Sequence, residues 1–171
     1  MPLLVVWLTL AACLAASYYD LQWRRIPNAI TGSLALTAVL VHAFFGLGSL
    51  AQSLGVMAAL TVGGYLLYSR GGIGAGDIKL AIAGSGMLSY PLCVPFLLYT
   101  GIAGGLIALV FLLARASGRA SLSRAVFMTL AGAPGIATDK REKLPYALAF
   151  ALGAILVALS QSIAPFLRIS I

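Results

Sequence analysis

Long apolar runs dominate this chain and restrict it to one class of fold. Several stretches of about 18 to 23 residues carry few or no charges, and about 20 apolar residues are what an α-helix needs to cross a bilayer. Only 9% of the 171 residues are charged, against about 25% in soluble domains. We therefore predict an all-α, polytopic membrane protein that folds as a single domain over residues 1–171.

Six transmembrane helices are expected. Four follow directly from the apolar runs: residues 2–19, about 28–45, about 50–68 and 145–167. The stretch from Leu80 to Ala114 would make a helix of about 52 Å, too long for one crossing of a ~30 Å hydrocarbon core and slightly short for two. A turn near Ser89-Tyr90-Pro91 would bring the basic segments on both sides of this stretch to the same face, which the positive-inside rule favours.

The charges also give the orientation. With six spans, both termini lie outside the cytoplasm, and all Lys and Arg residues except Arg168 lie on the cytoplasmic face, together with all four acidic residues. The net charge of +7 is spread over short segments between apolar runs, so we expect contacts with anionic membrane lipids and no nucleic acid. Leu10-Ala11-Ala12-Cys13 is similar to a lipoprotein cleavage box, but no Lys or Arg precedes the apolar run, which favours an uncleaved first span.

Two carboxylates stand at the edges of apolar segments and are the candidates for chemistry. Asp77 follows a glycine-rich stretch, Gly71–Gly76, and Asp20 ends the first apolar run. An Asp at membrane depth costs about 2.5–3.5 kcal/mol on insertion scales, so it is a functional candidate by default. The six-span arrangement places both residues on one face of the membrane, where a pair of neighbouring carboxylates could share a proton and activate a water molecule for peptide hydrolysis.

The glycines next to Asp77 allow two interpretations. They either let another backbone approach the carboxylate closely or form a flexible loop between spans. A phosphate-binding loop is excluded because GxxxxGK[ST] is absent and no strand precedes the glycines. His42, Cys13 and Cys93 lie in separate apolar segments without metal-ligand spacing, so we interpret them as structural and predict neither a metal nor a cofactor.

Three motifs resemble those of the type IV prepilin peptidases. They are the GxGD signature in Gly74-Ala75-Gly76-Asp77-Ile78-Lys79-Leu80, the first-aspartate motif in Asp20 followed by Arg25-Ile26-Pro27-Asn28, and a third feature in Lys143-Leu144-Pro145-Tyr146-Ala147. The resemblance extends over nearly the whole chain. GxGD alone is a weak signal, whereas its combination with the upstream motif at matching topology is specific.

This resemblance implies an aspartic intramembrane peptidase of the bacterial inner membrane, with Asp20 and Asp77 as the catalytic pair. Such enzymes remove the short basic leader from prepilins at the cytoplasmic face. Larger family members carry an insertion with paired CxxC motifs and also methylate the new N-terminus. Here only a short connection separates the first two predicted spans, so the chain looks like the peptidase-only branch associated with Flp-type (tight adherence) pili.

Six further residues are candidates for binding substrate or shaping the site: Gly74, Gly76, Lys79, Arg25, Pro27 and Asn28. Lys79 and Arg25 could instead anchor the chain at the lipid interface, and Asn28 could simply start a helix. A basic leader would favour an acidic docking surface, whereas the predicted cytoplasmic face is basic. We therefore expect recognition of the apolar helix of a prepilin in a groove near Asp77.

Two other functions stay open from the sequence. The first is a related intramembrane protease with a different helical substrate. The second is a small proton- or ion-coupled transporter or a pilus-assembly scaffold. A transporter would place its charges near the middle of the spans, whereas Asp20 and Asp77 lie at the ends of theirs. The oligomeric state does not follow from the sequence.

Overall fold

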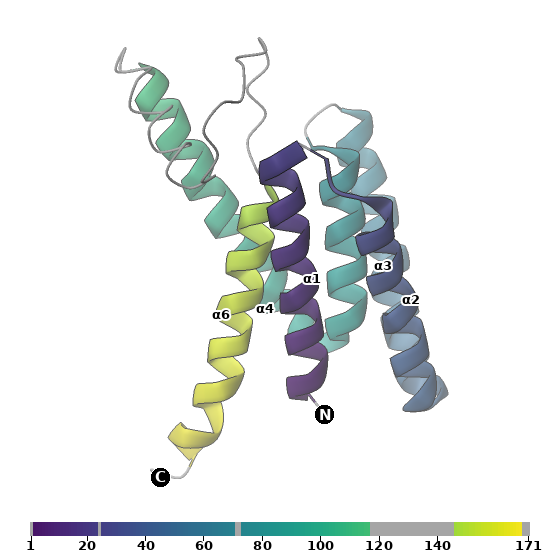
Figure 1. Cartoon of the computed structure of the whole chain (residues 1–171). Coiled ribbons are helices and arrows are strands. Elements are labelled where there is room, and N and C mark those ends of the chain that lie inside the picture. Colours follow the sequence, from purple (N-terminus) through teal and green to yellow (C-terminus); the bar gives the residue numbers. More distant parts are fainter. Residues whose placement is uncertain (1, 24, 71–72, 117–145, 169–171) are drawn as a thin grey trace.

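A computed structural model describes residues 2–23, 25–70, 73–116 and 146–168 of the chain. Five helices make up this part, as an all-α fold predicts (Figure 1): α1 (Pro2–Trp23), α2 (Asn28–Phe44), α3 (Leu47–Ser69), α4 (Ala75–Ala116) and α6 (Tyr146–Arg168). The basic segment before the last helix, residues 117–145, lies outside the described residues.

Three of the described helices are long and apolar enough to cross a membrane: Leu3–Trp23 of α1, Leu47–Ser69 (α3) and Ala75–Val110 of α4. Two shorter apolar helices, α2 and the Tyr146–Ser162 part of α6, accompany them. Most of their large apolar side chains outside the core face outward, as expected where lipid is the solvent. The protein is therefore a helical membrane protein.

Helix α1 is longer than predicted. The apolar run was expected to end as a span at residue 19, but the helix continues to Trp23 because the next helix-breaking residue is Pro27. Asp20 thus lies inside the last turn of α1 rather than in the loop beyond it. Pro27, with φ of −61° and an extended ψ of 133°, then precedes the first residue of α2.

The predicted turn within the long apolar stretch is found as a break in α4. Ser89 (φ 54°, ψ −179°) and Tyr90 (φ −77°, ψ 138°) leave the helical conformation immediately before Pro91. Figure 1 shows that the two arms of α4, residues 75–88 and 91–116, run in opposite directions, so that both ends of α4 lie at the same end of the bundle. The start of α1 and the end of α6 lie at the other end.

The break deprives the carbonyl groups of Gly86 and Met87 of their helical partners. In a continuous helix the carbonyl of Met87 would accept a hydrogen bond from the amide of residue 91, but proline has no N–H. The carbonyl of Gly86 loses its partner because Tyr90 is not helical. Buried carbonyls without partners destabilise a fold, more so away from water. Other helices must therefore supply donors.

Side chains from α2 and α3 provide these donors. The Ser53 hydroxyl of α3 donates to the Gly86 carbonyl over 2.8 Å, and His42 Nε2 of α2 lies 3.0 Å from the Met87 carbonyl oxygen. Since a carbonyl can only accept, Nε2 carries the proton, and Nδ1 pairs with the Ser49 hydroxyl over 2.7 Å. His42 therefore supports the break in α4, in agreement with its structural interpretation.

Helix α4 is the centre of the packing and contacts each of the other described helices. Its buried apolar side chains join two clusters, one with α1 and α6 and one with α1 and α2. Alanine and other small residues are frequent in both clusters, which allows close approach of the helices, as in other membrane bundles. The first turn of α4 is thereby fixed relative to the ends of α1 and α2.

Candidate active site

Asp77 is the third residue of α4 and its carboxylate folds back over the start of the helix. It accepts a hydrogen bond from the backbone N–H of Gly74, the residue before the helix. This is the reverse half of a capping box, which satisfies an amide that the helix itself leaves unpaired. A Cβ on Gly74 would lie 2.8 Å from Asp77 Oδ2, so this position has room for the carboxylate only because it is glycine.

Asp20 approaches this carboxylate from the last turn of α1. The two groups are close enough to repel each other electrostatically, and both residues are half-buried. The ends of α1 and α4 that carry them lie at the same end of the bundle (Figure 1). Two acidic residues distant in sequence thus form one acidic pair at the end of the membrane-embedded bundle.

Gly76 lets the connection between α1 and α2 pass directly beside Asp77. A Cβ on Gly76 would lie 3.3 Å from the Cβ of Ile26, closer than most real contacts of this kind. At Gly76 the close neighbour is a side chain of another segment, Ile26, whereas at Gly74 it is the Asp77 carboxylate itself. Arg25, whose side chain is exposed, and Pro27 flank Ile26 in this connection.

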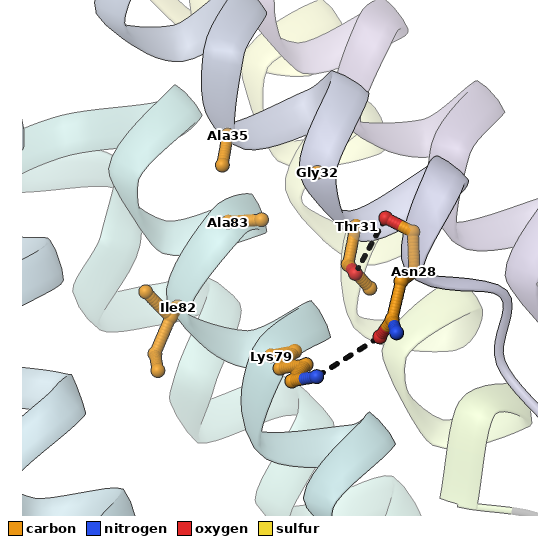
Figure 2. Close-up of a pocket in the computed structure, with 7 residues that line it drawn as sticks. All are labelled: Asn28, Thr31, Gly32, Ala35, Lys79, Ile82 and Ala83. Atoms are coloured by element: carbon orange, nitrogen blue, oxygen red, sulfur yellow. Dashed lines mark hydrogen bonds between the residues drawn. The ribbon is translucent and has the colours of Figure 1, made fainter.

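Lys79 and Asn28 form a pair of their own. The Lys79 ammonium donates to Asn28 Oδ1 over 2.9 Å, linking the fifth residue of α4 to the first residue of α2. Figure 2 shows both side chains at one end of a groove between these helices, which is lined by Asn28, Thr31, Gly32, Ala35, Lys79, Ile82 and Ala83. Asn28 is the first residue of α2, as predicted, but its side chain also bonds to another helix.

The sequence reasoning expected a groove near Asp77 but did not identify α2 and α4 as its walls, and it missed the donors at the break. Pro91 was a local signal that the Met87 carbonyl would lack a partner, but no local signal identified His42 or Ser53 as the donors. Among the described residues, no group of three or more His, Cys, Asp or Glu could hold a metal ion. Arg24, Gly71 and Gly72 and the third motif up to Pro145 lie outside the described residues.

Comparison with protein families shows to which family the chain belongs. The model of the type IV leader peptidase family matches residues 7–109, more than half of the chain. The chain belongs to this family. No match was found among curated proteins or among solved structures.

Membership in the type IV leader peptidase family makes the protein a peptidase, and thus a hydrolase. The matched region runs from α1 through most of α4 and includes both Asp20 and Asp77. It does not include α6 or Lys143-Leu144-Pro145-Tyr146-Ala147, so the third motif has no support from this match. The shared region therefore coincides with the helices that carry the acidic pair.

Proposed function

We propose that this peptidase is an aspartic endopeptidase in which Asp20 and Asp77 are the catalytic pair. The observation that carries the proposal is the electrostatic contact between the two carboxylates, which come from the ends of α1 and α4. Neighbouring carboxylates share a proton and titrate as a unit. Such a pair holds a base and an acid side by side, which peptide hydrolysis by water requires.

In the proposed reaction a water molecule between the carboxylates attacks the carbonyl carbon of the scissile peptide bond. The ionised Asp takes a proton from the water, and the protonated Asp gives its proton to the carbonyl oxygen. The resulting diol collapses as the C–N bond breaks: the leaving nitrogen receives the proton held by the first Asp, and one diol hydroxyl returns its proton to the second Asp as the C=O bond re-forms. Water is the nucleophile, and neither a side-chain nucleophile nor a metal takes part.

The proposed substrate is a type IV prepilin of the Flp type, with a basic leader followed by an apolar helix. The family match supports a leader peptide as substrate. The proposed topology has six crossings, counting the two arms of α4 separately, in the inner membrane of a bacterium with both termini outside the cytoplasm. The acidic pair then faces the cytoplasm, the side on which a basic leader remains under the positive-inside rule.

Co-expression with a Flp-type prepilin and immunoblotting for the shortened pilin tests the proposal. Asp20→Asn and Asp77→Asn should each reduce processing by at least about 100-fold, since acid–base catalysis contributes about that much or more. Asparagine at position 77 keeps an acceptor oxygen for the Gly74 amide, so the start of α4 should survive the change. Membrane levels of each variant show whether it is still inserted.

Asp139→Asn is the matched control, because it removes an acidic residue that the sequence places in the basic segment before the last helix. It should process the prepilin normally. Normal processing by either Asp20→Asn or Asp77→Asn would refute the catalytic pair. Purified enzyme should also stay active in EDTA, and loss of activity there that Zn²⁺ restores would refute the metal-free mechanism.

A further inference from the structure

The groove between α2 and α4 has apolar walls and a charged end. Its volume is about 310 Å³, within the range of about 300–1,000 Å³ found for small-molecule sites. Gly32, Ala35 and Ala83 contribute little or no side chain to the walls of the groove. The Thr31 hydroxyl donates back to the Asn28 carbonyl of its own helix over 3.3 Å (Figure 2). The walls therefore offer contact mainly to hydrocarbon.

The end near the acidic pair has the opposite character. Lys79 is exposed there, and the bond described for its ammonium goes to the neutral amide of Asn28. The Asn28 amide nitrogen carries N–H donors beside this positive charge. An ammonium and an amide together suit a phosphate group, which accepts hydrogen bonds and carries negative charge. A basic leader peptide, in contrast, would be repelled by Lys79.

We propose that this groove binds an anionic glycerophospholipid. The phosphate is held by Lys79 and Asn28, and an acyl chain lies along α2 and α4 against Gly32, Ala35 and Ala83. Lys79 is the fifth residue of α4 and the groove runs from there along both helices, so the headgroup lies at the membrane surface and the chain within the hydrocarbon. This site is separate from the acidic pair and does not depend on the proposed peptidase mechanism.

Photolabelling in lipid nanodiscs tests this proposal. The probes are phosphatidylglycerol and phosphatidylcholine, each with a photoreactive group in one acyl chain, and the labelled peptides are mapped by mass spectrometry. Phosphatidylglycerol should label the groove-lining parts of α2 and α4. Lys79→Gln should lower this labelling about fivefold, because one Lys near a membrane surface contributes about 1 kcal/mol to anionic lipid binding. Labelling by phosphatidylcholine should not change.

Gly32→Leu should block the groove to both lipids. A Cβ at Gly32 meets no atom within 4 Å, so the new side chain starts in open space at the groove wall. Gly55→Leu on α3, which has equally open surroundings, is its matched control, and Arg70→Gln is the control for losing one positive charge. Neither control should alter labelling of the groove.

Three results would overturn the lipid assignment. The first is equal labelling of the groove in Lys79→Gln and wild type by phosphatidylglycerol. The second is equal labelling in Gly32→Leu and Gly55→Leu. The third is displacement of the lipid label by inorganic phosphate alone or by a prepilin peptide, which would assign the groove to a free anion or to the substrate.

Discussion

Gly153 of α6 faces Thr100 of α4 so closely that a Cβ on the glycine would overlap the threonine hydroxyl oxygen. The same Cβ would lie 3.0 Å from the Thr100 backbone nitrogen and 3.2 Å from the Phe96 carbonyl oxygen. Because backbone atoms are among the neighbours, a rotamer change cannot relieve the contact. The absence of a side chain at Gly153 thus sets the distance between α4 and α6.

Gly153→Ala should therefore destabilise the protein, by about 1–3 kcal/mol as in other overpacked cores. Gly105→Ala is the matched control, because a Cβ at Gly105 meets nothing within 4 Å. This control should be neutral or more stable by up to about 1 kcal/mol, since alanine favours a helix over glycine. Thermal unfolding in detergent measures both. Equal stability of the two variants would contradict the close packing at Gly153.

His42→Ala should destabilise the break in α4 by leaving the Met87 carbonyl without its donor. The expected loss is about 0.5–2 kcal/mol, in line with single hydrogen bonds in water and in membranes. Ser53→Ala should have a similar effect through the Gly86 carbonyl. Ser33→Ala should change little, because that exposed hydroxyl only donates within its own helix. Unfolding curves that do not distinguish Ser53→Ala from Ser33→Ala would argue against this role.

Gly76→Val should lower peptidase activity while leaving the helices intact. The new side chain would collide with Ile26 and push the connection between α1 and α2 away from Asp77. Adding Ile26→Ala should restore part of the activity, because it removes Cγ1 and Cδ1, two of the three Ile26 atoms nearest to the new side chain, and leaves only Cβ. Gly63→Val on α3, where a Cβ meets nothing within 4 Å, provides the control. Rates of leader removal measure the effect, and a double variant no better than Gly76→Val would count against direct contact.

The rate of leader cleavage should depend on pH as a bell-shaped curve. The proposed mechanism needs one proton on the acidic pair, so activity falls at low pH, where both groups are protonated, and at high pH, where both are ionised. Cleavage of a synthetic leader peptide by purified enzyme across the pH range measures this. A rate that rises with pH to a plateau would indicate a single ionised group and would contradict a shared proton.

Local sequence signals were sufficient to predict the helices and the break in α4. The apolar runs marked the helices because burial in lipid requires them, and Pro91 marked the break because proline lacks the N–H of a helix interior. The predicted ends of the helices were less accurate. α3 begins at Leu47 rather than near residue 50, since a single glycine with positive φ, Gly46, is enough to make the turn from α2.

Pairings between distant residues could not be predicted in the same way. Lys79 and Asn28 are 51 positions apart, and His42 and Met87 are 45 apart. Such pairings depend on how two helices are rotated and at what depth they lie relative to each other. Apolar periodicity does not determine either of these when a helix faces lipid on one side and protein on the other. Charge placement brought Asp20 and Asp77 to the same face, but only the packing of α1 against α4 brings their side chains into electrostatic contact.

The break at Ser89 and Tyr90 also determines the direction in which the second arm of α4 runs. If these two residues were helical, α4 would finish at the end of the bundle opposite to Asp77. Instead both ends of α4 lie at one end of the bundle, and the start of α1 and the end of α6 lie at the other (Figure 1). One non-helical dipeptide thus converts a single long rod into a helical hairpin.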